Sequence, residues 1–129
     1  MLPLKKISSL ALCAALSALA GCGGSPNCGP VGLNVSPTAA TVDHNAAPPA
    51  NSQLFSASFQ FSHSSGCPAV TAALVNSNWT VSDPSVHLSA SQGTQVTATC
   101  TAAVTTPVTI TATSVSGQMF TGHASLTCN

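Results

Sequence analysis

Charged residues are almost absent from this sequence. Its 129 residues include two lysines and two aspartates, with no arginine and no glutamate. Because lysine and arginine are the groups that neutralise phosphates, this scarcity argues against nucleic acid as a partner. Asp43 and Asp83 are the only carboxylates and belong to different loops, so the chain offers little for acid–base catalysis. The composition therefore predicts a protein that is not an enzyme.

Aromatic residues are also scarce, since the chain has no tyrosine, four phenylalanines and one tryptophan. Trp79 and Val81 lie two residues apart, so both point to one face of a strand. Asp83, Pro84 and Ser85 then favour a turn, and Val86–Leu88 restarts the alternation. This pattern indicates the middle of a β-sandwich. The predicted core aromatics are Trp79, Phe55, Phe59 and Phe120.

The N-terminal segment has the pattern of an export signal. Lys5 and Lys6 precede an apolar run over residues 7–19, which ends in Leu-Ala-Gly-Cys at residues 19–22. This segment resembles a bacterial lipoprotein signal peptide, and the resemblance implies removal of residues 1–21 and acylation of Cys22. An ordinary signal peptide is the alternative. A spanning helix is disfavoured, because about 13 apolar residues fall short of the ~20 that cross a bilayer.

Removal of the signal would leave Asp43 and Asp83 as the only formal charges, a net charge of −2. Membrane attachment would then depend on the N-terminal lipid rather than on a basic patch. Residues 22–29 are interpreted as the acylated cysteine and a flexible tether, and residues 30–129 as one domain. The expected location is the cell envelope. The resemblance to lipoproteins of hosts with two membranes implies the outer membrane in such a host, because Gly23 rather than aspartate follows the cysteine.

Four cysteines remain for the exported domain. An even number in a small exported domain predicts two disulfides, and three pairings are open. No two of them have the Cys-x-x-Cys spacing of a redox or zinc site, so neither a metal nor another cofactor is expected. The four are Cys28, Cys67, Cys100 and Cys128.

Alternating apolar residues predict about seven short strands, with a turn every 8–12 residues. The clearest alternation runs over residues 54–61. Residues 31–35 and 40–42 are expected to form one edge strand interrupted by a bulge at Pro37. The long connection 63–76 could hold a helical turn at residues 69–75. The other predicted strands are the one carrying Trp79, Val86–Leu88, Gln95–Cys100, Val108–Ser114 and residues 120–128.

Four blocks of sequence resemble the bacterial Ig-like domain of the group 2 type. They are VSPTAATV at residues 35–42, FSA at 55–57, WTVSDPSV at 79–86 and VTITATS at Val108–Ser114. The resemblance implies a seven-stranded, antiparallel immunoglobulin-like sandwich at the cell surface, without catalytic residues. Two features depart from the family pattern: the four cysteines and the length of the 63–76 connection.

The strand directions of such a sandwich predict the disulfide pairing. Each successive strand reverses direction, so Cys28 and Cys67 fall at one end, and Cys100 and Cys128 at the other. The two alternative pairings would span the long axis, and a five-residue strand already covers about 17 Å, against a limit of about 7 Å between bridged Cα atoms. The expected bonds are Cys28–Cys67 and Cys100–Cys128.

The remaining polar groups do not assemble into a recognisable site. The four histidines, at positions 44, 63, 87 and 123, have no spacing that chelates an ion. The expected function is a structural, adhesive or protein-presenting role, with a surface protein or glycan as partner. The alternative is a small carbohydrate- or ligand-binding module, which would need exposed aromatic side chains.

Overall fold

A computed structural model of the chain describes residues 27–63 and 65–129, and this part contains no helix. It confirms the predicted all-β sandwich. The signal segment and Cys22 lie outside the described residues. The nine strands are β1 (Pro30–Ser36), β2 (Ala39–Val42), β3 (Ser52–Phe61), β4 (Ser77–Val81), β5 (Val86–Leu88), β6 (Gln92–Gly93), β7 (Gln95–Cys100), β8 (Val108–Ser114) and β9 (Thr121–Cys128).

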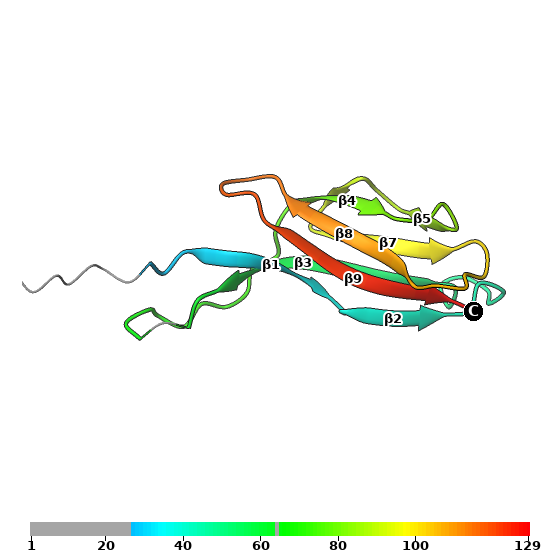
Figure 1. Cartoon of the computed structure of the whole chain (residues 1–129), viewed down its shortest axis with the longest axis horizontal. Coiled ribbons are helices and arrows are strands. Elements are labelled where there is room, and N and C mark those ends of the chain that lie inside the picture. The colour runs from blue at the N-terminus through cyan, green and yellow to red at the C-terminus, as the bar shows by residue number, and fades with distance from the viewer. Residues whose placement is uncertain (1–26, 64) are drawn as a thin grey trace, which may run out of the picture.

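The strands form two sheets that pack face to face (Figure 1). One has the order β1-β3-β7-β5, and the other has the order β2-β9-β8-β4-β6. The first order is that of strands A, B, E and D of immunoglobulin domains, and β9-β8-β4 corresponds to G, F and C. The fold is therefore an immunoglobulin-like sandwich. Its pairs are antiparallel apart from β2 and β9, which run parallel, so the expectation of purely antiparallel strands is wrong there.

The segment around Pro37 also differs from the expected single edge strand. β1 pairs with β3, whereas β2 pairs with β9 of the opposite sheet. The chain therefore crosses between the sheets at residues 37–38 instead of bulging. Pro37 has no N–H to donate to a ladder, so the sheet gains little by continuing through it. The chain keeps its direction across the gap, which makes β2 parallel to its new neighbour.

Residues 69–75 do not form the helical turn considered above. Leu74 instead makes an isolated antiparallel bridge to Ser58 on β3. The Val75 N–H donates to the Ala57 carbonyl oxygen at 2.9 Å. β-Branched residues such as Val70 and Val75 favour extended backbone, and pairing with β3 satisfies polar groups that one helical turn would leave open.

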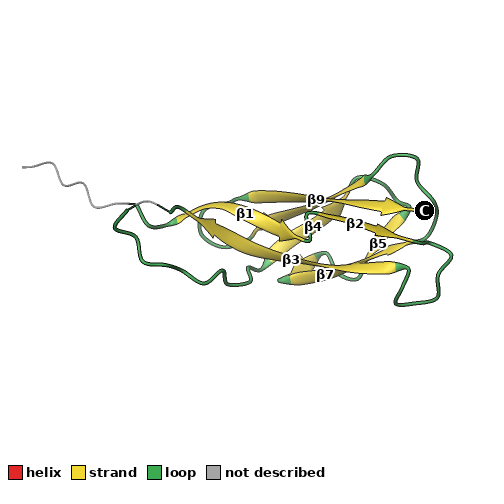
Figure 2. Cartoon of the chain, turned by 90° about the horizontal axis from the view of Figure 1, so that it is seen from below, coloured by secondary structure: helices red, strands yellow, loops and turns green. Residues whose placement is uncertain are grey.

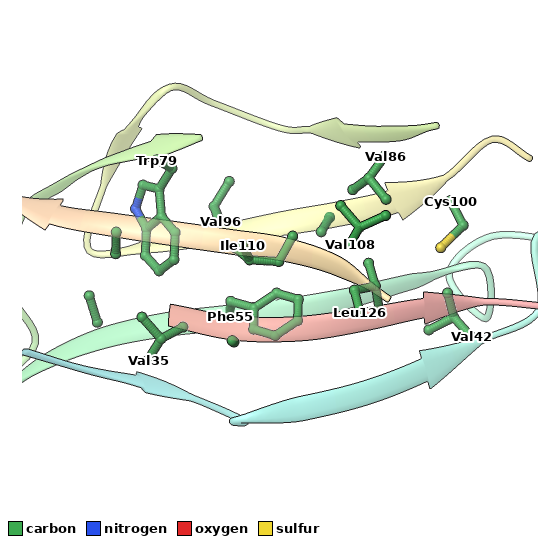
Figure 3. Packing of buried hydrophobic residues seen from close by; sticks show 14 of the residues in the cluster. Val35, Val42, Phe55, Trp79, Val86, Val96, Cys100, Val108, Ile110 and Leu126 are labelled. Carbon is green, nitrogen blue, oxygen red and sulfur yellow. The ribbon is translucent and has the colours of Figure 1, made fainter. Parts of the chain in front are cut away.

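The core lies between the sheets, with Trp79 near one end and Leu126 and Val42 toward the other (Figure 3). Phe55 is fully buried, and Trp79 is 3 % exposed. The Trp79 Nε1–H donates to the Gly93 carbonyl oxygen at 2.8 Å, so its polar atom is paired. Phe59 and Phe120 are only partly buried and border the core, with ring centroids 6.1 Å apart. Their assignment as core residues is thus too strong.

The sandwich is elongated, and its described ends differ (Figures 1 and 2). The chain enters at one end, where β1 begins, β3 ends, and the long loop and the β8–β9 hairpin lie. We call this end the N-terminal pole, comprising residues 28–31, 59–63, 65–76 and 115–120. The distal pole comprises residues 43–51, 82–85, 100–107 and 128–129.

Candidate functional site

Two disulfides close the two poles, with the pairing predicted from strand direction. Cys28–Cys67 has a Cα–Cα distance of 5.4 Å and links the segment before β1 to the long loop. Cys100–Cys128 has a Cα–Cα distance of 5.7 Å and joins β7 to β9, and therefore one sheet to the other. Cys100 and Cys128 are both buried. The first bond thus fixes a loop at the N-terminal pole, and the second fixes the sheets at the distal pole.

The tryptophan occupies the strand that carries it in antibody domains, but the disulfide lies elsewhere. In antibody domains a bridge between strands B and F packs against this indole. The corresponding strands here are β3 and β8, which supply Phe55 and Ile110 to the core. Apolar packing therefore fills the centre of the sandwich, and the inter-sheet disulfide lies near its distal end.

The histidines are spread over the molecule. His44 lies at the distal pole, where its Nδ1 contacts the Asn129 backbone oxygen. His63 lies in the loop of the N-terminal pole, and His87 and His123 are on outward strand positions. The His123 ring nitrogen Nδ1 lies 3.1 Å from Thr111 Oγ1. Across the described residues, no three His, Cys, Asp or Glu side chains come together in a group that could hold a metal ion.

Asp83 stabilises its own turn. Its carboxylate accepts a hydrogen bond from the Ser85 backbone N–H at 2.8 Å. This backbone hydrogen bond holds the pKa of Asp83 below its ordinary value, and a weaker contribution from a hydrogen bond with the Ser85 side chain acts in the same direction. Desolvation of the carboxylate opposes the change. The Val86 N–H also donates to the Asp83 carbonyl oxygen at 3.3 Å. Asp83 is therefore satisfied within the corner that leads from β4 to β5.

A hollow of about 180 Å³ lies beside the Cys28–Cys67 bond and is lined by Phe61, His63, Pro68 and Val70 among others. Pockets that enclose a small organic ligand usually measure about 300–1,000 Å³. The hollow is therefore too small for such a ligand.

Exposed apolar side chains at the N-terminal pole are a feature that the sequence analysis missed. Met119 lies in the β8–β9 hairpin, and Val70 and Leu74 lie in the long loop. The sequence signal that could have identified them is the presence of large apolar residues in segments whose turn-forming residues indicate loops. Alternation identified the strands but gave no role to these residues.

The sequence matches no protein-family model, no curated protein and no solved structure. The bacterial Ig-like family of the group 2 type therefore stays a prediction made from the four sequence blocks. Within residues 27–63 and 65–129, no helix has the length and apolar character needed to cross a membrane.

Proposed function

We propose that this chain is an exported lipoprotein whose immunoglobulin-like domain has a structural, adhesive or protein-presenting role in the cell envelope. Cys22 would carry the lipid, and the sandwich would act through its surface rather than through a reaction. The observation that carries this proposal is the Leu-Ala-Gly-Cys sequence at residues 19–22, just before a sandwich stapled by two disulfides.

The shape of the domain supports a presenting role. The chain enters at the N-terminal pole, and the loops of the distal pole lie at the other end of the long axis (Figure 1). A lipid on Cys22 would hold the N-terminal pole near the membrane. The distal loops, which contain both carboxylates, would then face outward toward a surface protein or glycan. Loops positioned by a rigid sandwich commonly carry binding function.

A carbohydrate-binding module is the second candidate, and the packing of Trp79 weighs against it. The indole is 3 % exposed and packs between the sheets, so it is not available to stack on a sugar. The other aromatic side chains outside the core centre belong to Phe59, Phe61 and Phe120, at the end where the anchor would attach.

Replacement of Cys22 tests the anchoring. We expect Cys22→Ala to abolish labelling by a radioactive fatty acid and to move the protein from the membrane fraction, or leave it unprocessed. Cys13→Ala is the matched control, because it changes a cysteine inside the signal and should leave labelling unchanged. An unmodified Cys22 thiol in the native protein, found by intact-mass measurement, would contradict the proposal.

A further inference from the structure

Large apolar side chains are concentrated on the surface of the N-terminal pole. Among the described residues, six large hydrophobic side chains are clearly exposed, and Leu54 is the only one of them outside this pole. Met119 is the most exposed, at 73 %. A concentration of exposed apolar side chains at one end of a domain points to an interaction surface. The five at the pole are Val31, Val70, Leu74, Val115 and Met119.

These side chains project from segments that are fixed to the sandwich. The Val115 N–H donates to the Asn76 carbonyl oxygen at 3.2 Å, which joins the hairpin to the end of the long loop. The Ser114 hydroxyl accepts a bond from the Phe120 N–H at 2.9 Å and closes the base of the hairpin. The Cys28–Cys67 disulfide holds the other side of the loop beside the entering chain. The exposed apolar side chains therefore lie on segments that hydrogen bonds and a disulfide hold in place.

Half-buried phenylalanines connect this surface with the core. The Phe59 ring packs edge-on against Phe61 at a centroid distance of 6.3 Å and against Phe120 at 6.1 Å. Three of the four phenylalanines thus lie at one end of the sandwich. Phenylalanine with aliphatic neighbours is the composition that enters the boundary between lipid headgroups and acyl chains.

The charged side chains of the described residues lie at the other end of the molecule from the exposed apolar ones of the N-terminal pole. Asp43 and Asp83 both lie at the distal pole, and the N-terminal pole has no carboxylate, lysine or arginine among its described residues. His63 is its one titratable side chain apart from the disulfide-bonded cysteines. A surface without carboxylates can approach a bilayer without desolvating a charge or meeting repulsion from anionic lipid.

We propose that the N-terminal pole lies directly on the lipid surface, with Met119, Val70 and their apolar neighbours in contact with the bilayer. This inference rests on the proposed acylation of Cys22. Five residues lie between Cys22 and Cys28, and the six steps from one to the other span at most about 22 Å, so the anchor would keep the pole close to the lipid. Because the pole lacks lysine and arginine, the contact should form on zwitterionic lipid and should not weaken with salt.

Tryptophan placed at the pole tests the contact. The acylated protein, residues 22–129 with Met119→Trp, is reconstituted into phosphatidylcholine vesicles, with and without brominated acyl chains that quench indole emission. We expect the added tryptophan to show blue-shifted emission that the brominated lipid quenches. Val70→Trp in the long loop is an independent second variant. Trp79 gives a common background in all proteins because it is buried.

Ala103→Trp is the matched control, because Ala103 is exposed at the distal pole. Its emission should not respond to brominated lipid. Vesicle flotation of each protein separates the two proposals. If the protein floats with the vesicles but brominated lipid quenches the added tryptophan of neither Met119→Trp nor Val70→Trp, the lipid contact of the pole is overturned and the lipid anchor stands. Absence of flotation for the wild-type protein overturns both. If the added indole of the Met119→Trp variant shows a blue shift without vesicles that grows with protein concentration, pairing with a second copy replaces the lipid contact.

Discussion

At the scale of single residues, Trp79 shows how a scarce residue type can locate the core. It is the one tryptophan in a chain without tyrosine, and the alternation around it placed it correctly between the sheets. Phe59 and Phe120 obey the same alternation but lie near the end of the sandwich, where the opposite sheet no longer covers them fully. Phase along a strand predicts the face of a side chain, whereas burial also depends on its distance from the end.

Truncation of Trp79 should be among the most damaging single changes. We expect Trp79→Ala to lower the free energy of unfolding by about 3–5 kcal/mol, because a large buried aromatic is lost. Trp79→Phe should cost less, because it keeps much of the apolar packing and loses chiefly the hydrogen bond from Nε1 to the Gly93 carbonyl oxygen. Urea unfolding followed by circular dichroism measures both. Thr80→Ala is the control, because Thr80 is the exposed neighbour of Trp79. This change should alter the free energy of unfolding by less than about 0.5 kcal/mol. A loss below about 1 kcal/mol for Trp79→Ala would contradict the packing.

Asp83 predicts an acid-dependent part of the stability. Its hydrogen bonds with Ser85 lower its pKa in the folded state, so folding favours the ionised carboxylate. This stabilisation is fully present above the ordinary carboxyl pKa of about 4 and is lost as the pH falls from there through the lower folded-state pKa. Wild type should therefore lose more stability than Asp83→Asn between about pH 5 and pH 2. Equal losses in thermal unfolding across this range would show that the hydrogen bonds with Ser85 do not favour the ionised form.

At the scale of elements, alternation predicted the strands well and the crossing between sheets poorly. Gln95–Cys100 and Val108–Ser114 have the predicted limits, and every second residue of each is buried, as alternation requires. The path of β1 and β2 could not be read from the sequence, because alternation continues on both sides of Pro37 whether the chain bulges or changes sheets. The choice depends on which neighbour is available, and β9 is more than 80 residues further along the chain.

Gly122 on β9 is required by the close approach of β1. A Cβ built at this position would lie 2.6 Å from the Leu33 carbonyl oxygen, which belongs to the backbone and cannot rotate away. We expect Gly122→Ala to destabilise the domain by about 1–3 kcal/mol, as overpacking usually does. Chemical unfolding measures the loss.

Gly32→Ala on β1 is the control for Gly122→Ala. A Cβ there would meet the flexible end of the Gln60 side chain at 3.2 Å, so the neighbour can move. Its loss should be clearly smaller than that of Gly122→Ala. Equal stability of the Gly122→Ala variant and wild type would mean that β1 does not pack as closely on β9 as the structure has it.

At the scale of the whole molecule, the poles were only partly predictable. Strand reversal was enough to assign each cysteine to an end, and the pairing followed from that. The apolar surface of the N-terminal pole was not predictable in the same way. It draws on three segments far apart in the sequence, the start of β1, the long loop and the β8–β9 hairpin, and only the fold brings them to one end.

The two disulfides should contribute to stability independently. Cys28–Cys67 and Cys100–Cys128 lie at opposite poles and close loops that follow one another in sequence without overlapping, with separations of 39 and 28 residues. Each should stabilise by about 3–4 kcal/mol on the chain-entropy model, with a larger loss at the buried Cys100–Cys128 bond, where a cavity adds to the cost. Since neither the folded surroundings nor the unfolded loops are shared, the losses should add within about 0.5 kcal/mol.

Paired cysteine-to-alanine variants of each bridge, and of both together, measure this additivity. The variant without either bridge could lose most of a total stability of about 5–15 kcal/mol, so all proteins are unfolded in urea in the presence of the stabilising osmolyte TMAO. The bonds themselves are mapped in wild type on peptic peptides under non-reducing conditions, because residues 22–129 contain no lysine or arginine for trypsin. An interaction energy above about 1 kcal/mol would mean that the two poles fold as one coupled unit through the core between them.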